Sequence, residues 1–88
     1  MYYVYVLISL KDGNLYTGFA RDLPSRISKH NYGEVGATKG RRPLKLIYYE
    51  MCLSKKDTLH RERYLKTSWG KKYIKNRLRS YLKNATMK

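Results

Sequence analysis

The strongest structural signal in the chain is a pair of apolar runs joined by turn-forming residues near the N-terminus. Residues 2–9 are dominated by β-branched and aromatic side chains, and a second short run covers residues 15–19. Asp12, Gly13 and Asn14 lie between them. Runs of this composition on either side of such a turn predict a β-hairpin. A hairpin alone is only marginally stable in water, so the remainder of the chain must supply a further strand and covering helices.

The rest of the chain predicts one more strand and three helices. Asp22 is a typical N-cap, and Pro24 follows in the first turn of a helix that ends near residues 30–33. Residues 33–43 contain three glycines, a proline and several basic residues, and we interpret them as a basic loop. The remaining predicted elements are a strand over residues 44–50, a helix from Ser54 to about Thr67 and, beyond Gly70, a third helix with the apolar stripe Ile74, Leu78 and Leu82.

The element order β-β-α-β-α-α predicts an α+β domain. We expect a three-stranded, mainly antiparallel sheet flanked by three helices, because strands covered by helices are stable where a lone hairpin is not. A chain of 88 residues has room for one modest core. We therefore predict a single domain over residues 1–83 and a frayed C-terminal tail over residues 84–88.

The charge of the chain constrains its partners. Twenty Lys and Arg against six Asp and Glu give a formal charge of +14, a self-repulsion that favours a polyanionic partner. Nucleic acid fits best, since basic residues recur from Lys11 to Lys88, whereas an anionic membrane would favour one basic amphipathic helix beside a neutral domain. The alternative is that the basic residues form a solvated surface that only keeps the protein soluble. We expect no membrane partner and no obligate protein partner.

Cysteine content and the N-terminal segment indicate the compartment. The single cysteine, Cys52, allows no internal disulfide and no cysteine-based zinc site, which fits a reducing cytoplasm. The apolar run at residues 2–9 is too short to span a bilayer and lacks the basic leader and cleavage site of a signal peptide. We therefore expect a cytoplasmic protein.

Two predicted helices carry polar side chains on faces that should be apolar. Arg26 and His30 share the helical spacing of Leu23 and Ile27, so we expect both at the edge of that apolar stripe. A histidine near a helix end is also common as a surface or capping residue, because the helix dipole favours a cation there.

In the second helix the same spacing links Thr58, Glu62, Leu65 and Trp69, which turns Glu62 inward beside an indole. An inward carboxylate needs a cation. The simplest alternative to a functional site is a partly buried ion pair between Arg26 and Glu62.

Two of the ten tyrosines are singled out by the hairpin. If the hairpin loop holds an even number of residues, Tyr5 and Tyr16 project from one face of the sheet. Gly18 would leave room there for the backbone of a ligand. Otherwise these tyrosines are half-buried packing residues or stacking surfaces for bases.

Taken together, these residues resemble a known family, the GIY-YIG endonuclease superfamily, and most closely its small single-domain bacterial members. Residues 3–5 (Tyr-Val-Tyr) are similar to its Gly-Ile-Tyr element, and residues 16–18 (Tyr-Thr-Gly) to its Tyr-Ile-Gly element. Tyr3 and Val4 replace the glycine and isoleucine of the first element, and Thr17 the isoleucine of the second. The series Tyr5, Tyr16, Arg26 and His30, with intervals of eleven, ten and four residues, followed by a helix-borne Glu62, is more specific than either motif.

The resemblance implies metal-dependent hydrolysis of nucleic-acid phosphodiester bonds, with DNA favoured over RNA and repair or recombination structures among the candidate substrates. One divalent cation, Mg²⁺ or Mn²⁺, would be held by Glu62, waters and a phosphate oxygen. Arg26 would clamp the scissile phosphate, Tyr5 would act as general base, and Tyr16 would position water or phosphate. His30 would orient a phenol or accept its proton. Asn76 is the nearest match to an asparagine that several family enzymes carry after the glutamate.

Lys and Arg side chains of the loop and of the third helix are the expected phosphate contacts, which carry no sequence information. Two other functions stay open at this stage: a non-catalytic nucleic-acid-binding module of the same fold, and a basic adaptor that docks an acidic protein. The predicted nucleic-acid contacts are Lys39, Arg41, Arg42, Lys71, Lys72, Lys75, Arg77 and Arg79.

Overall fold

A computed structural model describes residues 1–86, and it confirms the predicted α+β fold and element order. The predicted third helix is divided into two. No helix in this range has both the length and the apolar character needed to cross a bilayer. The elements are β1 (Tyr2–Ser9), β2 (Leu15–Ala20), α1 (Leu23–Asn31), a short 3₁₀ turn η1 (Lys39–Arg41), β3 (Leu44–Cys52), α2 (Lys55–Leu65), α3 (Ser68–Arg77) and α4 (Arg79–Thr86).

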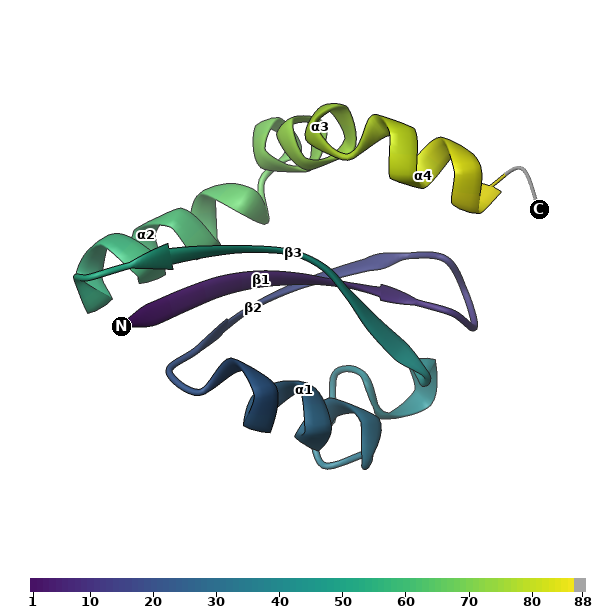
Figure 1. Ribbon diagram of the computed structural model, residues 1–88, viewed down its shortest axis with the longest axis horizontal. Coiled ribbons are helices and arrows are strands. Elements are labelled where there is room, and N and C mark those ends of the chain that lie inside the picture. The colour runs from purple at the N-terminus through teal and green to yellow at the C-terminus, as the bar shows by residue number, and fades with distance from the viewer. Residues whose placement is uncertain (87–88) are drawn as a thin grey trace.

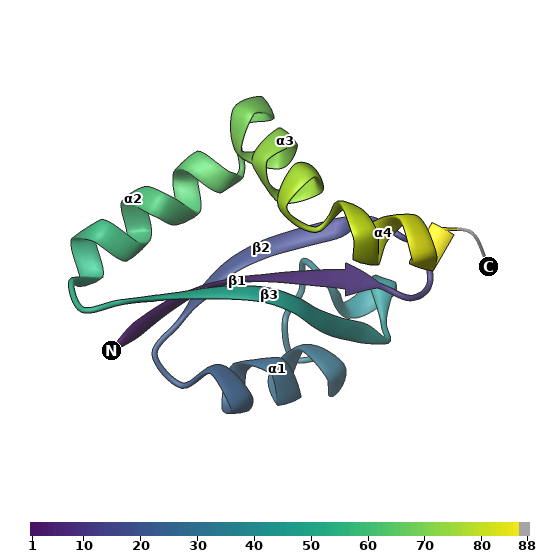
Figure 2. The ribbon, with the colours of Figure 1, turned by 45° about the horizontal axis from the view of Figure 1, so that its top comes forward.

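The sheet is antiparallel with the strand order β2-β1-β3, so β1 is its central strand. Helix α1 covers one face of the sheet, and α2, α3 and α4 form an arc over the other (Figures 1 and 2). With helices on both faces, the β1 segment 4–9 is buried throughout. This explains why its sequence lacks the apolar-polar alternation of a strand with one wet face.

The register of the hairpin decides which β1 side chains meet α1. Tyr5 lies opposite Gly18 and Leu7 lies opposite Tyr16. Because side chains alternate along a strand, Tyr5 and Tyr16 project from the same face, as predicted, and are diagonal neighbours. Two apolar cores result. The core on the α1 face contains Tyr5, Leu7, Ala20, Leu23 and Leu44, and the core on the opposite face contains Val4, Val6, Leu65 and Ile74.

Side-chain caps start the helices as the sequence predicts. The Asp22 carboxylate accepts a hydrogen bond from the Ser25 amide, and the Ser54 hydroxyl accepts one from the Asp57 amide. Helix α4 continues through residues 84–86 of the predicted tail, and residues 87–88 lie outside the described range.

The boundary between the second and third helices differs from the prediction. Gly70 lies inside α3 rather than before it, and the break falls at Lys66 and Thr67, where the Thr67 hydroxyl caps α3. A side chain at position 70 would collide with the backbone of Tyr64 and Leu65. The glycine is therefore needed for close helix contact and not for chain reversal. A further break at Leu78 separates α3 from α4.

An ion pair fixes the rotation of α2 about its axis. The Arg61 guanidinium donates two hydrogen bonds, each 2.9 Å long, to the Glu50 carboxylate of β3, and Tyr48 donates a third. Burial raises the pKa of Glu50, but the hydrogen bonds from Arg61 and Tyr48 and the charge of Arg61 outweigh burial and hold it below its ordinary value. Since Arg61 faces β3, its neighbour Glu62 is turned about 100° away from that strand.

Removing the acceptor of this ion pair should weaken the fold. We expect Glu50→Gln to lower the free energy of unfolding by roughly 1–3 kcal/mol, because a part-buried guanidinium loses a charged acceptor. Urea denaturation measures the change. Glu34→Gln is the matched control, since Glu34 is exposed and makes no ion pair among residues 1–86, and it should change stability by less than about 0.5 kcal/mol. Equal effects of the two substitutions would contradict the role of this pair.

Candidate active site

Tyr5 is the central residue of the candidate site. Its side chain is fully buried, and its hydroxyl lies 2.7 Å from Nε2 of His30 and 3.4 Å from Nε of Arg26. Burial raises the pKa of Tyr5; hydrogen bonding and charge from Arg26 counteract this, while the nearby Tyr16 and Glu62 add to it. The phenol is therefore neutral in the free protein.

The space beside Gly18 has a different use from the one expected. Any side chain at position 18 would collide with the phenol of Tyr5, which lies across the glycine. The glycine makes room for a side chain of the protein itself rather than for the backbone of a ligand. This contact lets an aromatic residue of the central strand reach over its neighbour in β2.

His30 is fully buried rather than at the edge of the α1 stripe, which corrects both the edge prediction and the surface alternative. Both ring nitrogens have partners, so burial leaves neither unsatisfied: Nε2 meets Tyr5, and Nδ1 lies 2.7 Å from the Thr38 hydroxyl oxygen. Burial, and then the positive charge of Arg26, lowers the pKa of His30, which favours a neutral ring. The rings of Tyr5 and Tyr16 approach it edge-on, with centroids 5.6 and 5.2 Å away.

Arg26 and Tyr16 connect this buried cluster to the surface. Both are partly exposed. Arg26 contacts Tyr5 through Nε and also lines a hollow of about 390 Å³, whose other charged residues are Arg21, Asp22 and Lys29. An anion entering this hollow would meet the donor fork of Arg26.

Glu62 approaches the cluster from α2, which packs against β1 and β2. Its side chain is 17% exposed and forms an ion pair with Lys66, with 3.2 Å between Nζ and Oε2. Its charge is close enough to raise the pKa of Tyr5. Within residues 1–86 there is no ion pair between Arg26 and Glu62, so the simplest structural alternative for these two residues is not found.

Comparison with known proteins identifies the family. The sequence model described as the GIY-YIG catalytic domain matches residues 1–73. The chain belongs to the GIY-YIG family. It is 47% identical over 76 residues to a UPF0213 protein of Staphylococcus saprophyticus, covering 84% of this chain and 90% of that one. A UPF0213 protein of Staphylococcus aureus is 43% identical with the same coverage.

A solved structure agrees with this placement. The solution NMR structure of a UPF0213 protein from Bacillus halodurans matches with a TM-score of 0.51 and 35% sequence identity, over 84% of this chain and 82% of that chain. The resemblance drawn from the ordered tyrosines, Arg26, His30 and Glu62 is thereby confirmed at the level of the family, which is a nuclease family.

Few protein ligands are available for a metal in this GIY-YIG domain. No group of three or more His, Cys, Asp and Glu side chains among residues 1–86 is arranged to hold an ion. Glu62 is the carboxylate beside the cluster. One carboxylate completed by waters and a phosphate oxygen suits a hard divalent cation such as Mg²⁺, so these donors fit a cation that binds mainly together with substrate.

Trp69 lies elsewhere than the helical spacing predicted, and Asn76 contacts Arg79. Trp69 is 72% exposed on α3, with the Lys72 ammonium 5.3 Å from its ring centroid, and it does not cover Glu62. The predicted spacing fails because α2 ends at Leu65. Asn76 is exposed on α3, where its carbonyl oxygens accept hydrogen bonds from Arg79, outside the Tyr5 cluster.

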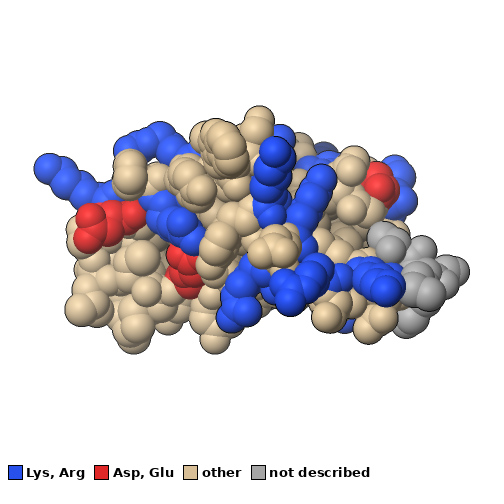
Figure 3. All heavy atoms as spheres, turned by 90° about the horizontal axis from the view of Figure 1, so that it is seen from above, with Lys and Arg blue, Asp and Glu red and all other residues tan. Residues whose placement is uncertain are grey.

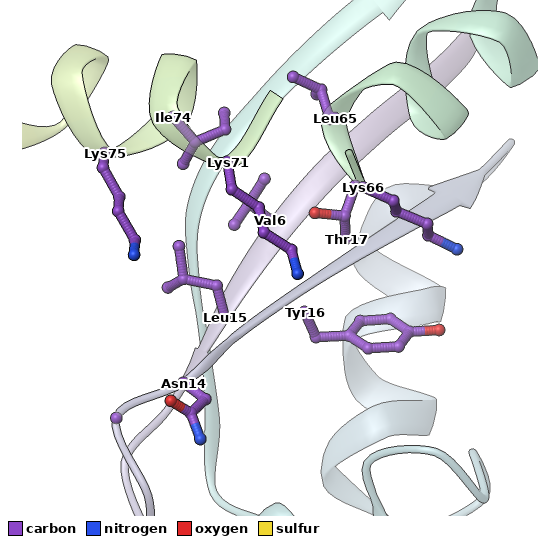
Figure 4. Close-up of a pocket in the computed structure, with 11 residues that line it drawn as sticks. Val6, Asn14, Leu15, Tyr16, Thr17, Leu65, Lys66, Lys71, Ile74 and Lys75 are labelled. Atoms are coloured by element: carbon purple, nitrogen blue, oxygen red, sulfur yellow. The ribbon is translucent and has the colours of Figure 1, made fainter. Parts of the chain in front are cut away.

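A groove that contains three lysines, here called the basic groove, lies between the hairpin and the α2–α3 segment and includes Tyr16 of the candidate site. It measures about 540 Å³ and is lined by Asn14, Leu15 and Tyr16 of the hairpin and by Lys66, Lys71 and Lys75 of the α2–α3 segment. Val6, Leu65 and Ile74 form its apolar part, and the ring of Tyr16 points away from Lys71 and Lys75 (Figure 4). Lys and Arg side chains also gather over the middle and the C-terminal part of this face of the molecule, where Asp and Glu are few (Figure 3).

The other predicted phosphate contacts are divided between surface and structural positions. Lys39 and Arg42 border a second hollow of about 490 Å³, while Arg41 is held by an ion pair to Asp12 at 3.1 Å. The Arg41 carbonyl also accepts a hydrogen bond from Ser9, so this arginine fastens the loop to the hairpin. Lys72 stacks on Trp69, and Arg77 is exposed.

Sequence reasoning missed two residues that contact the predicted cluster. The contact of Lys66 with Glu62 could have been predicted, since Lys66 stands four residues after Glu62 on a helix, which is the spacing of a favourable ion pair. The burial of Thr38 could not have been predicted, because a loop has no periodicity from which burial can be inferred.

The lowered pKa of His30 predicts that the stability of the fold depends on pH. A histidine whose pKa is lowered by folding binds fewer protons in the folded state, so its contribution to stability is complete above about pH 6.5 and is lost as the pH falls. Urea unfolding of the parental chain at pH 7.5 and at pH 5.0 should therefore show a loss of stability. His30→Gln should show a smaller loss over the same interval. The lowered pKa values of Asp12 and Glu50 act near or below about pH 4.5, outside this interval. A variant with an unchanged pH dependence would contradict the role of His30.

Proposed function

We propose that this protein is a metal-dependent endonuclease that hydrolyses phosphodiester bonds in nucleic acid, with DNA as the favoured substrate. The observation that carries the proposal is the hydrogen-bonded set of buried Tyr5 and His30 with partly exposed Arg26, beside the carboxylate of Glu62, in a chain of the GIY-YIG family. Hydrolysis needs an activated water, neutralisation of the developing phosphate charge, and help for the leaving oxygen.

The hydrogen bonds give the proton transfer a direction. Arg26 donates through Nε to the Tyr5 oxygen, which lies 2.7 Å from Nε2 of His30, and in the proposed mechanism the Tyr5 hydroxyl donates its hydrogen to Nε2 of the neutral ring. In the proposed step, Tyr5 takes a proton from the attacking water as its own proton passes to His30. The relay avoids forming a free phenolate, which the raised pKa of Tyr5 opposes.

Access to Tyr5 requires a movement of Arg26. The phenol is fully buried in the free protein, while Arg26, 3.4 Å from its oxygen, also borders an open hollow. A phosphate entering that hollow would draw the guanidinium away from Tyr5, because a bidentate phosphate contact is stronger than one long hydrogen bond to a phenol. Phosphate binding would thus uncover the base. Tyr16, which is partly exposed, would position the water or the phosphate.

Glu62 would hold the divalent cation, Mg²⁺ or Mn²⁺, together with waters and a phosphate oxygen. When bound, the cation supplies positive charge to the developing phosphorane and to the leaving oxygen. Lys66 now neutralises Glu62, and it would be released toward the phosphates in the groove. The lysines of the groove would hold the strand through its phosphates, without reading the sequence.

Two substitutions test the catalytic assignment in a nicking assay with Mg²⁺ or Mn²⁺. We expect Tyr5→Phe to slow cleavage by about 10²–10⁴-fold through loss of the base, and Glu62→Gln to slow it at least as much through loss of the cation. Tyr32→Phe and Glu34→Gln are matched controls, since both residues are exposed, and they should cleave at the parental rate. The substrate panel includes plain, branched and damaged DNA and RNA.

Other results of that assay would reject particular parts of the proposal. Cleavage by Tyr5→Phe at the parental rate, with Tyr16→Phe inactive, would transfer the role of base to Tyr16. If the folded parental chain binds every substrate and cleaves none, the alternative function of a non-catalytic nucleic-acid-binding module would be supported instead. If the protein binds an acidic protein and duplex DNA does not compete with that binding, the alternative function of a basic adaptor would be supported instead.

Salt dependence tests the groove. Removing two phosphate contacts with Lys71→Ala and Lys75→Ala should reduce the slope of log Kd against log salt concentration by about 2. The double variant Lys55→Ala and Lys56→Ala removes the same charge from exposed positions at the start of α2, outside the groove, and should reduce the slope less. Fluorescence anisotropy with labelled duplex gives both slopes. Equal reductions would show that net charge, and not the groove, determines binding.

A further inference from the structure

Thr38 is a fully buried polar residue in a loop that is otherwise mostly exposed. Its hydroxyl oxygen lies 2.7 Å from Nδ1 of His30 and 3.5 Å from the carbonyl oxygen of Val35. Its backbone is held as well, because its amide donates to Val35 and its carbonyl accepts from Arg41. The loop is thus folded so that one hydroxyl reaches the far side of the His30 ring from Tyr5.

The directions of the hydrogen bonds follow from the number of hydrogens available. Arg26 can only donate, so the Tyr5 oxygen accepts from it and the single Tyr5 hydrogen points to Nε2 of His30. Nε2 is then unprotonated, and a neutral ring carries its hydrogen on Nδ1, where the Thr38 oxygen accepts it. The Thr38 hydroxyl donates its own hydrogen to the carbonyl of Val35, 3.5 Å away, so toward Nδ1 its oxygen presents lone pairs and can only accept. Every polar group in this series of hydrogen bonds, from Arg26 to Val35, has a partner.

The opposite arrangement leaves a buried group without a partner. If Nε2 carried the hydrogen, it would donate to Tyr5, whose own hydrogen would then have no acceptor among the described residues around its fully buried hydroxyl. An unpaired buried hydroxyl is costly. Geometry therefore favours the tautomer with the hydrogen on Nδ1.

We propose that Thr38 is a positioning residue that keeps His30 in the tautomer protonated on Nδ1, so that Nε2 is free to accept the hydroxyl proton of Tyr5. The catalytic consequence rests on the proposed nuclease function; the tautomer does not. After the transfer, both N–H groups of the charged ring still have acceptors, Thr38 on one side and the Tyr5 oxygen on the other. Thr38 thus serves the ring both before and after it receives the proton.

The first test measures the tautomer directly, with no substrate. In the intact chain with ¹⁵N-labelled histidine at pH 7.5, the imidazole nitrogen shifts should give a protonated Nδ1 and an unprotonated Nε2 for His30. The exposed His60 provides the internal reference, and His60→Gln assigns the two signals. A parental His30 protonated on Nε2 would overturn the proposal without any variant.

Two substitutions separate positioning from packing. Thr38→Val fills the same volume but removes the acceptor, so the His30 signals should shift toward protonation on Nε2. Thr38→Ser restores the hydroxyl in a smaller side chain, and the parental tautomer should return. If the valine variant is folded, as judged by amide dispersion, and keeps the parental tautomer, Thr38 does not set it.

Turnover adds a second readout. We expect Thr38→Val to lower kcat for nicking by at least about tenfold, with little change in KM, because proton acceptance and not binding is affected. Thr38→Ser should recover most of the rate. A shifted tautomer with unchanged kcat would overturn the catalytic part of the proposal. If the parental chain cleaves nothing, the proposed function fails, and the nitrogen shifts still decide the role of Thr38.

Discussion

The buried contact between Tyr5 and His30 is the interaction on which the rest of the site depends. A phenol and an imidazole can both be fully buried here because each polar atom meets another, at 2.7 Å, and because Gly18 leaves the space in which the phenol lies. Replacing either partner with an apolar residue would leave the other unsatisfied. The same contact joins β1 to α1, so the core of this face and the candidate chemistry share their central residues.

The two faces of the sheet contribute different parts of the candidate site. On the α1 face, the side chains of Tyr5 and Tyr16 reach His30 and Arg26. On the other face, the Arg61–Glu50 ion pair sets the rotation of α2, and Glu62 is thereby turned away from β3 and toward the cluster. A site assembled from both faces needs each helix to be fixed independently. The caps at Asp22 and Ser54 and the ion pair at Glu50 provide this fixation.

How much could be predicted from the sequence depended on whether a residue stands in a periodic element. Tyr5 and Tyr16 could be assigned to one face because strand alternation and an even loop determine it. Helical periodicity predicts His30 at an edge because it gives a direction and says nothing of partners; Thr38, which allows the ring to be buried, comes from a loop. The spacing that predicts Trp69 beside Glu62 holds only within one helix, and the Thr67 cap, not the glycine, breaks the helix between them. Tertiary partners, rather than propensities, account for these differences.

The free protein holds its candidate catalytic groups in a protected state. Arg26 contacts the Tyr5 oxygen, and Lys66 neutralises Glu62, so each group proposed to act on substrate is paired with a cation of the protein itself. In the proposed mechanism, the same two cations are the ones that phosphates would attract, Arg26 in the hollow beside α1 and Lys66 in the groove beside α3. Phosphate binding would then release the base and the carboxylate together. A chain with a charge of +14 has few carboxylates to balance its cations, so a polyanion is the partner that could displace both pairs at once.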